Sequence, residues 1–104
     1  MNAFAAAIDV MFEDENMALD ALYRAGGAGS GVPVRVIRRA PDRFANFGEG
    51  RFVTDTVLID VRTSEIAALS PGDTFQIGAT VFEVRSEPVR DSERLIWAAE
   101  AREL

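Results

Sequence analysis

The stretch that decides the fold is 56-TVLIDVRTSEIAALSPGDTFQIGATVFEVRSEPVRDSERLIWAA-99. Its first part, Thr56 to Arg62, is rich in β-branched and apolar residues and predicts a strand. A short helical or irregular link from Ser64 to Leu69 follows. Ser70-Pro71-Gly72-Asp73 then predicts a turn, because proline fixes φ and glycine adopts conformations that other residues avoid. The stretch therefore opens with one strand and a defined turn.

The second part of the same stretch predicts a hairpin and a last strand. Strands over 74–77 and 80–85 flank the pair Gly78-Ala79, and glycine in the first loop position suits a tight two-residue turn. A charged tip at 89–92 leads into a final strand over 95–101, where we expect Trp97 to face the core.

The N-terminal segment predicts a helix from Asn2, a possible cap, to Glu13. Alanines favour the helix, and the acidic run that begins at Glu13 has the wrong sign to extend a helix C-terminus. Its larger apolar side chains recur at helical spacing: Phe4, Ile8, Met11 and Phe12. This stripe either packs on the domain or contacts a neighbouring subunit.

Two alternating apolar runs follow the helix. The run over 17–23 predicts a strand, although a helix also suits its first residues, and the run over 32–36 predicts a second strand. The glycine-rich segment between them predicts a flexible hairpin loop over residues 24–32.

The second irregular region spans residues 40–51 and is also expected to be a flexible loop. Its Phe44 and Phe47 either fold back on the core or are covered by a partner. Strand character resumes over 52–62. About six strands with one helix indicate a mainly β fold, a small antiparallel β-barrel or sandwich, in a single domain of residues 1–104.

Composition excludes most catalytic chemistry. The chain has no histidine and no cysteine, so serine–histidine and cysteine–histidine pairs, disulfides and thiolate or imidazole metal sites are impossible. A carboxylate pair remains conceivable for a hydrolase, but we expect Asp60 and Asp55 to face outward or support a turn. Asp14-Glu15-Asn16 begins like a calcium loop, yet the glycine and closing glutamate of such a loop are missing. We therefore expect no enzyme, no cofactor and no metal.

The charge distribution argues against tight binding of nucleic acid. The net charge is −6, and all 11 basic residues are arginines. Phosphate neutralisation needs a basic face, which this chain as a whole lacks. A local cluster is the exception and contains Arg35, Arg38, Arg39, Arg43 and Arg51. It could face DNA, but nearby acids favour a salt-bridge surface between proteins. No leader or membrane-spanning stretch is recognisable, so we expect a soluble, unexported protein.

The order of elements from Thr56 to Ala99 resembles the C-terminal half of the small head-tail joining proteins of lambda-like tailed phages and prophages. The segments that carry this resemblance are Val61-Arg62-Thr63, Ser64-Glu65-Ile66, Pro71-Gly72-Asp73-Thr74, Phe75-Gln76-Ile77-Gly78 and Phe82-Glu83-Val84. The N-terminal half agrees with that family in length and layout.

The resemblance implies a virion structural protein that is monomeric when free and forms a ring, expected to be a hexamer, at the head vertex. Its partners would be a portal or head completion protein and a tail terminator or tail tube protein, with DNA only as passing cargo and no membrane. It would work in the virion and, during assembly, in the host cytoplasm. A stopper or terminator position is an alternative, and a cellular β-barrel that binds a peptide or ligand is another. The interface candidates are Phe4, Ile8, Met11, Phe12, Arg35, Arg38, Arg39, Arg43, Phe44 and Phe47.

Overall fold

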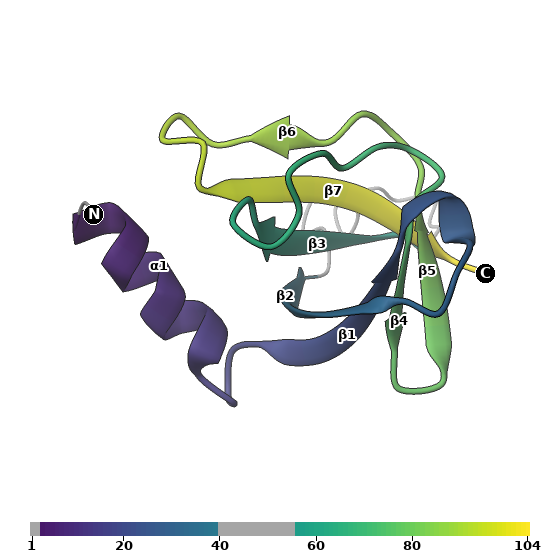
Figure 1. Cartoon of the computed structure of the whole chain (residues 1–104), viewed down its shortest axis with the longest axis horizontal. Helices are drawn as coiled ribbons and strands as arrows, with labels where there is room; N and C mark the ends of the chain where they lie inside the picture. Colours follow the sequence, from purple (N-terminus) through teal and green to yellow (C-terminus); the bar gives the residue numbers. More distant parts are fainter. Residues whose placement is uncertain (1–2, 40–55) are drawn as a thin grey trace, which may run out of the picture.

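The protein folds into one helix and a strongly curved sheet (Figure 1). The computed structural model describes residues 3–39 and 56–104. In chain order the elements are α1 (Ala3–Glu13), β1 (Leu19–Arg24), the short 3₁₀ helix η1 (Ala25–Gly27), β2 (Val32–Arg39), β3 (Thr56–Arg62), β4 (Thr74–Ile77), β5 (Thr80–Val84), β6 (Val89–Arg90) and β7 (Ile96–Glu103).

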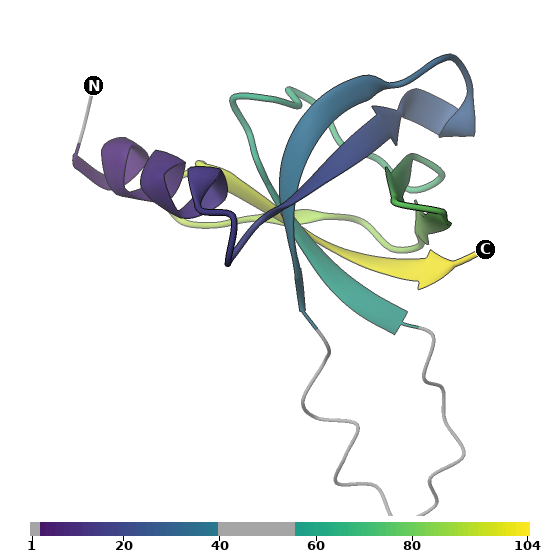
Figure 2. The ribbon, with the colours of Figure 1, turned by 90° about the horizontal axis from the view of Figure 1, so that it is seen from below.

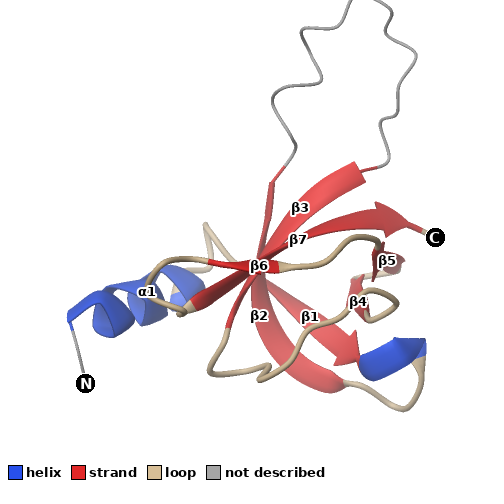
Figure 3. Ribbon diagram, turned by 90° about the horizontal axis from the view of Figure 1, so that it is seen from above, coloured by secondary structure: helices blue, strands red, loops and turns tan. Residues whose placement is uncertain are grey.

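Six of these strands close into an antiparallel barrel. The strand order is β3-β2-β1-β4-β5-β7, and β7 returns to pair with β3. The seam is long, from Thr56 opposite Arg102 to Arg62 opposite Ile96. Figure 3 shows the strands arranged around a common centre. The structure thus confirms the mainly β prediction and selects the barrel over the sandwich, with a single helix before it among the described residues.

The core of the barrel comes from the inward-facing residues of the alternating strands. Val34 and Val36 on β2 and Ile59 and Val61 on β3 are buried with Phe75 of β4. Because side chains alternate between the two faces of a strand, Asp60 lies outward between two core residues. Its carboxylate accepts two hydrogen bonds from Arg39, at 3.0 and 2.9 Å.

The link between β3 and β4 is irregular and contributes to the core through Ile66 and Leu69. The indole Nε1 of Trp97 donates a hydrogen bond to the Ile66 carbonyl at 2.8 Å, and the half-buried ring packs against the core cluster. The last strand therefore fixes the position of this link.

The turn at 70–73 holds together three parts of the chain. Gly72 has a φ of +95°, as the third position of a type II turn requires, and the Asp73 amide donates to the Ser70 carbonyl. The buried Asp73 carboxylate accepts hydrogen bonds from the Tyr23 hydroxyl at 2.6 Å, the Gly26 amide at 2.8 Å and the Ser70 amide at 3.0 Å. One carboxylate therefore joins this turn to β1 and η1.

Alkaline pH is expected to destabilise the protein through Tyr23. Burial, with the hydrogen bond and the negative charge of Asp73, raises the pKa of Tyr23 well above its usual value near 10. The folded state therefore keeps a proton that the unfolded state loses above about pH 10, so the free energy of unfolding falls as pH rises from there. Urea unfolding between pH 8 and 11 measures this slope. Tyr23→Phe should flatten it, and an equal slope in both proteins would contradict the assignment.

The structure differs from the sequence-based predictions at residues 89–90. Val89–Arg90, predicted as part of a charged tip, form strand β6, with Val89 opposite Ala98 and Arg90 opposite Trp97. Two residues carry no periodicity, so only the pairing with β7 reveals this strand. The strand predicted over 17–23 is confirmed as β1, Leu19–Arg24, which pairs with both β2 and β4.

The loop predicted over residues 24–32 joins β1 to β2, as expected for a hairpin, and contains η1. Its ends belong to the strands, because Arg24 closes β1 and Val32 opens β2. The Arg24 guanidinium donates to the Gly29 carbonyl across the loop. Its flexibility stays a prediction. The loop predicted over 40–51 lies outside the described residues.

Candidate functional site

Helix α1 is apolar on almost all sides, although only part of it packs on the barrel. Its sequence AFAAAIDVMFE contains two polar residues, Asp9 and Glu13. Phe12 is fully buried, whereas Phe4 is 61% exposed and Val10 is 68% exposed. Figures 1 and 2 show the helix extending away from the barrel. A helix that is hydrophobic all round is normally buried, so this one presents an uncovered apolar surface.

The residues of the predicted apolar stripe differ in how far the barrel covers them. Phe12 lies against the barrel, Ile8 and Met11 are half-buried, and Phe4 is exposed near the start of the helix. Asn2, the predicted cap, lies outside the described residues. The division means that the middle and the last turn of α1 anchor the helix, through Asp9 and Phe12, while Phe4 in its first turn stays accessible to a partner.

Arg62 at the end of β3 holds the helix in place. Its guanidinium donates hydrogen bonds to Asp9 of α1 at 3.0 Å and to Glu65 at 2.9 Å, and it lies 5.3 Å from the centre of the Phe12 ring. Burial alone favours the neutral form of this side chain, but the two carboxylates outweigh it and raise the pKa of Arg62. The guanidinium therefore stays charged. It connects helix α1, strand β3 and the irregular segment between β3 and β4.

Arg35 on β2 also contacts the end of helix α1. We call the contacts of Arg62 and Arg35 with α1 the helix junction. Its side chain donates to the Phe12 carbonyl at 3.0 Å, to the Asp20 carboxylate at 2.7 Å and to the Ala18 carbonyl at 3.4 Å. Its backbone amide donates to Glu65 at 3.2 Å. The last carbonyls of a helix lack partners within the helix, so Arg35 satisfies one of them and fixes where α1 ends.

The predicted basic cluster is spread over several environments. Arg35, Arg38 and Arg39 all lie on β2. Arg39 forms the bidentate pair with Asp60, and the Arg38 guanidinium lies 5.8 Å from the centre of the Phe82 ring. Arg43 and Arg51 lie outside the described residues, as do Phe44 and Phe47. Arg35 and Arg39 thus have partners within the chain, and the role of the cluster at an interface stays a prediction.

Arg62, Glu65 and Asp9 are not among the functional residues predicted from the sequence. One signal was available, since Arg62 and Glu65 stand three residues apart directly after a buried strand. The third member cannot be found in this way, because Asp9 lies 53 residues away along the chain.

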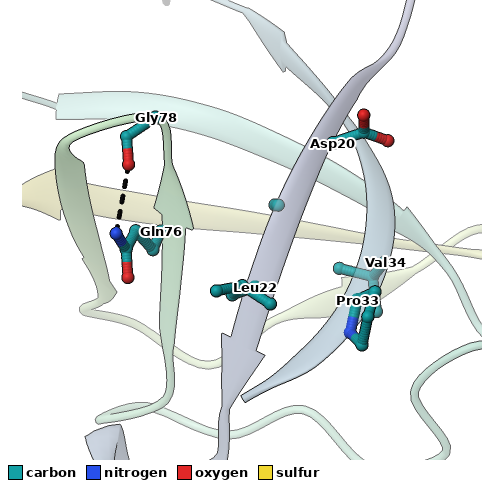
Figure 4. A pocket seen from close by; sticks show the side chains of 7 residues that line it. Asp20, Leu22, Pro33, Val34, Gln76 and Gly78 are labelled. Carbon is teal, nitrogen blue, oxygen red and sulfur yellow. Dashed lines mark hydrogen bonds between the residues drawn. The ribbon is translucent and has the colours of Figure 1, made fainter. Parts of the chain in front are cut away.

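A surface pocket of about 230 Å³ lies beside β1. Figure 4 shows Leu22 between Gln76 on one side and Pro33 and Val34 on the other, and Asp20 also lines the pocket. The lining is mostly apolar. Its volume is below the roughly 300 to 1,000 Å³ of pockets that enclose drug-sized ligands. The pocket therefore does not favour the alternative of a dedicated ligand-binding barrel.

The acidic residues serve structural roles where their contacts are defined. Asp14, which begins the calcium-like run, accepts a hydrogen bond from the Asn16 amide and closes a local turn. Within residues 3–39 and 56–104, no three histidine, cysteine or acidic side chains gather in a way that would hold a metal ion. In the same part of the chain, no helix has the length and hydrophobicity needed to cross a membrane.

Comparison with known proteins identifies one family. A comparison with curated proteins found no match. A scan against protein families matches residues 1–101, nearly the whole chain, to the family described as Phage Head-Tail Attachment protein. That family consists of structural proteins and is not an enzyme family, and it places the protein in a phage particle in contact with head and tail components. The chain belongs to the phage head-tail attachment family.

Proposed function

We propose that this protein forms a ring at the vertex of the DNA-filled head and provides the surface on which the preformed tail docks. On the head side the ring contacts a portal or head completion protein, and on the tail side a tail terminator or tail tube protein. The subunits are free in the host cytoplasm until they meet the head. DNA passes through the ring and is not a binding partner.

The observation that carries this proposal is the uncovered helix α1 in a protein of the attachment family. An apolar helix with Phe4 and Val10 in solvent is costly in a free protein and useful in an assembly, because its burial contributes only when a neighbour covers it. The interface candidates on this helix are Phe4, Ile8 and Met11, whereas Phe12 positions it.

The net charge of −6 supports a passive role toward DNA. A ring that grips phosphates would slow the DNA that has to slide through it, and negative charge at the lumen repels the backbone. The protein is therefore expected to act without catalysis and without a cofactor, through surfaces alone.

Deletion of the gene from a producing strain is expected to separate heads from tails. Electron microscopy of the lysate should show DNA-filled heads beside free, complete tails, because each structure assembles without the other and only the connection is lost. Expression of the intact chain from a plasmid in the same strain is the control and should restore joined particles. Joined particles in the deletion strain itself would contradict the proposal.

A further inference from the structure

The turn between β6 and β7 holds Arg94 in a backbone conformation that favours glycine. Arg94 has a φ of +60° and, among residues 3–39 and 56–104, is the one residue other than glycine with a positive φ. A side chain in this left-handed region is sterically unfavourable. Such outliers persist only where the surrounding structure enforces them, and they concentrate at functional sites. An arginine at this position therefore costs stability that a glycine would not.

The backbone of this turn is fixed by its neighbours, which leaves the Arg94 side chain in solvent. The Asp91 carboxylate accepts hydrogen bonds from the Leu95 amide at 2.7 Å and the Ile96 amide at 3.0 Å. The Thr63 hydroxyl donates to the Arg94 carbonyl at 2.8 Å. The Arg94 guanidinium is exposed and forms no hydrogen bond or ion pair within the described part of the chain. The turn therefore presents an unpaired cation at a fixed place.

The last residue of α1 breaks a second local rule, with the opposite charge. A helix C-terminus carries a partial negative charge, which favours cations and disfavours acids. Glu13 ends α1, its side chain is exposed, and the last turn of the helix contains no basic residue. Arg35 reaches this end of the helix but forms its ion pair with Asp20. Across residues 3–39 and 56–104, Glu13 has no ion pair.

Arg94 and Glu13 do not pair within one chain. Leu95, next to Arg94, lines a small hollow with Ala5 and Ile8 of α1, whereas Glu13 is the last residue of that helix. Figure 1 shows the turn between β6 and β7 apart from the end of α1. A free chain therefore keeps both charges unpaired on separate parts of its surface. Positions that break local rules in this way are expected at functional sites.

We propose that Arg94 of one copy forms an ion pair with Glu13 of the next copy around the ring. The two groups have opposite charges and belong to the same chain, so the same contact can repeat from copy to copy. A contact between two different surfaces closes into a ring when the rotation between copies permits, and a closed ring leaves neither group unpaired. The inference rests on the proposed function, because it supplies a contact between subunits of the proposed ring.

The net charge of the chain favours a second copy as the partner. Each copy carries a charge of −6, so copies that lie side by side repel one another. A cation that reaches a carboxylate of the neighbouring copy offsets part of this repulsion. An exposed ion pair adds little to affinity and more to orientation and specificity. The pair therefore orients subunits that gather at the head and does not hold free subunits together.

Exchange of the two charges tests the inference. Heads and tails from the deletion strain are mixed with purified variants, and joined particles are counted by electron microscopy. Arg94→Glu and Glu13→Arg each bring like charges together and should lower the count at least about tenfold. The chain with both substitutions restores the ion pair in reverse and should join within about threefold of the natural chain.

The matched control combines Glu13→Arg with Arg102→Glu. Arg102 is exposed on β7, so this chain has the same net charge as the exchanged chain but lacks the reversed pair. It should stay as defective as Glu13→Arg alone. Equal recovery in the control, or no recovery in the exchanged chain when that chain is folded, would overturn the inference.

Melting temperatures separate the contact from folding. Arg94→Gly removes the strained backbone, and Glu13→Arg places a cation at the helix C-terminus, so both variants should melt a few degrees higher while both lose joining. Arg94→Gly that joins as well as the natural chain would refute the subunit contact and leave the joining role intact. Heads and tails that join without any protein would refute that role instead.

Discussion

Asp73→Ala is expected to lower the free energy of unfolding by about 3 to 5 kcal/mol, because three hydrogen bonds are lost together. The carboxylate is buried and accepts three hydrogen bonds, from Tyr23, Gly26 and Ser70. Removing it takes the shared acceptor from the Tyr23 hydroxyl and from two backbone amides at once. Urea unfolding measures the loss as a lower midpoint with an unchanged slope.

Two further variants separate the carboxylate from its surroundings. Tyr23→Phe removes one of the three donors and should cost about 1 to 3 kcal/mol, less than Asp73→Ala. Asp73→Asn keeps the shape and one acceptor and should fall between the other two. If Asp73→Ala were no more destabilising than a surface substitution, within about 0.5 kcal/mol, the role of this carboxylate in joining the turn to β1 and η1 would be wrong.

Phe12→Ala is expected to release α1 from the barrel. A fully buried phenylalanine contributes about 3 to 5 kcal/mol, and Phe12 is the one fully buried residue of the helix. An isolated helix of this length is marginal in water, so the released segment should unfold. Hydrogen exchange measures this directly as lost protection of the α1 amides while the amides of β3 and β7 stay protected.

The matched control for this prediction is Val10→Ala on the same helix. Val10 is 68% exposed, so its truncation should change the protection of α1 by no more than about 0.5 kcal/mol. Unchanged protection in Phe12→Ala would show that Arg62 and Arg35 hold α1 without the aromatic anchor. Because released α1 no longer presents Phe4 in a fixed position, Phe12→Ala should also fail to restore joining in the deletion strain.

The sequence predicted the local features of the fold well. The turn at 70–73 and the Gly78 hairpin were predictable because proline and glycine restrict the backbone within a few residues. The strand over 56–62 was predictable because its alternation matches a half-buried sheet. β6 was not, since two residues have no period and gain their structure from β7, several residues further along the chain.

The candidate site shows where local reasoning stops. Helical spacing identified the stripe from Phe4 to Phe12, but spacing cannot say which of these residues the barrel covers. The helix junction depends on the ion pair between Arg62 and Asp9, which lie 53 positions apart along the chain. The pocket depends on where the pairing between β1 and β4 ends. Both depend on contacts between segments far apart along the chain, which no short segment encodes.

The measurement that tests the central claim most directly is joining in vitro. Heads and tails from the deletion strain are mixed with the purified chain, and joined particles are counted by electron microscopy. The account predicts that joined, infectious particles appear only when the protein is added. Heads and tails that join equally well without the protein, or that stay apart when it is added, would contradict it.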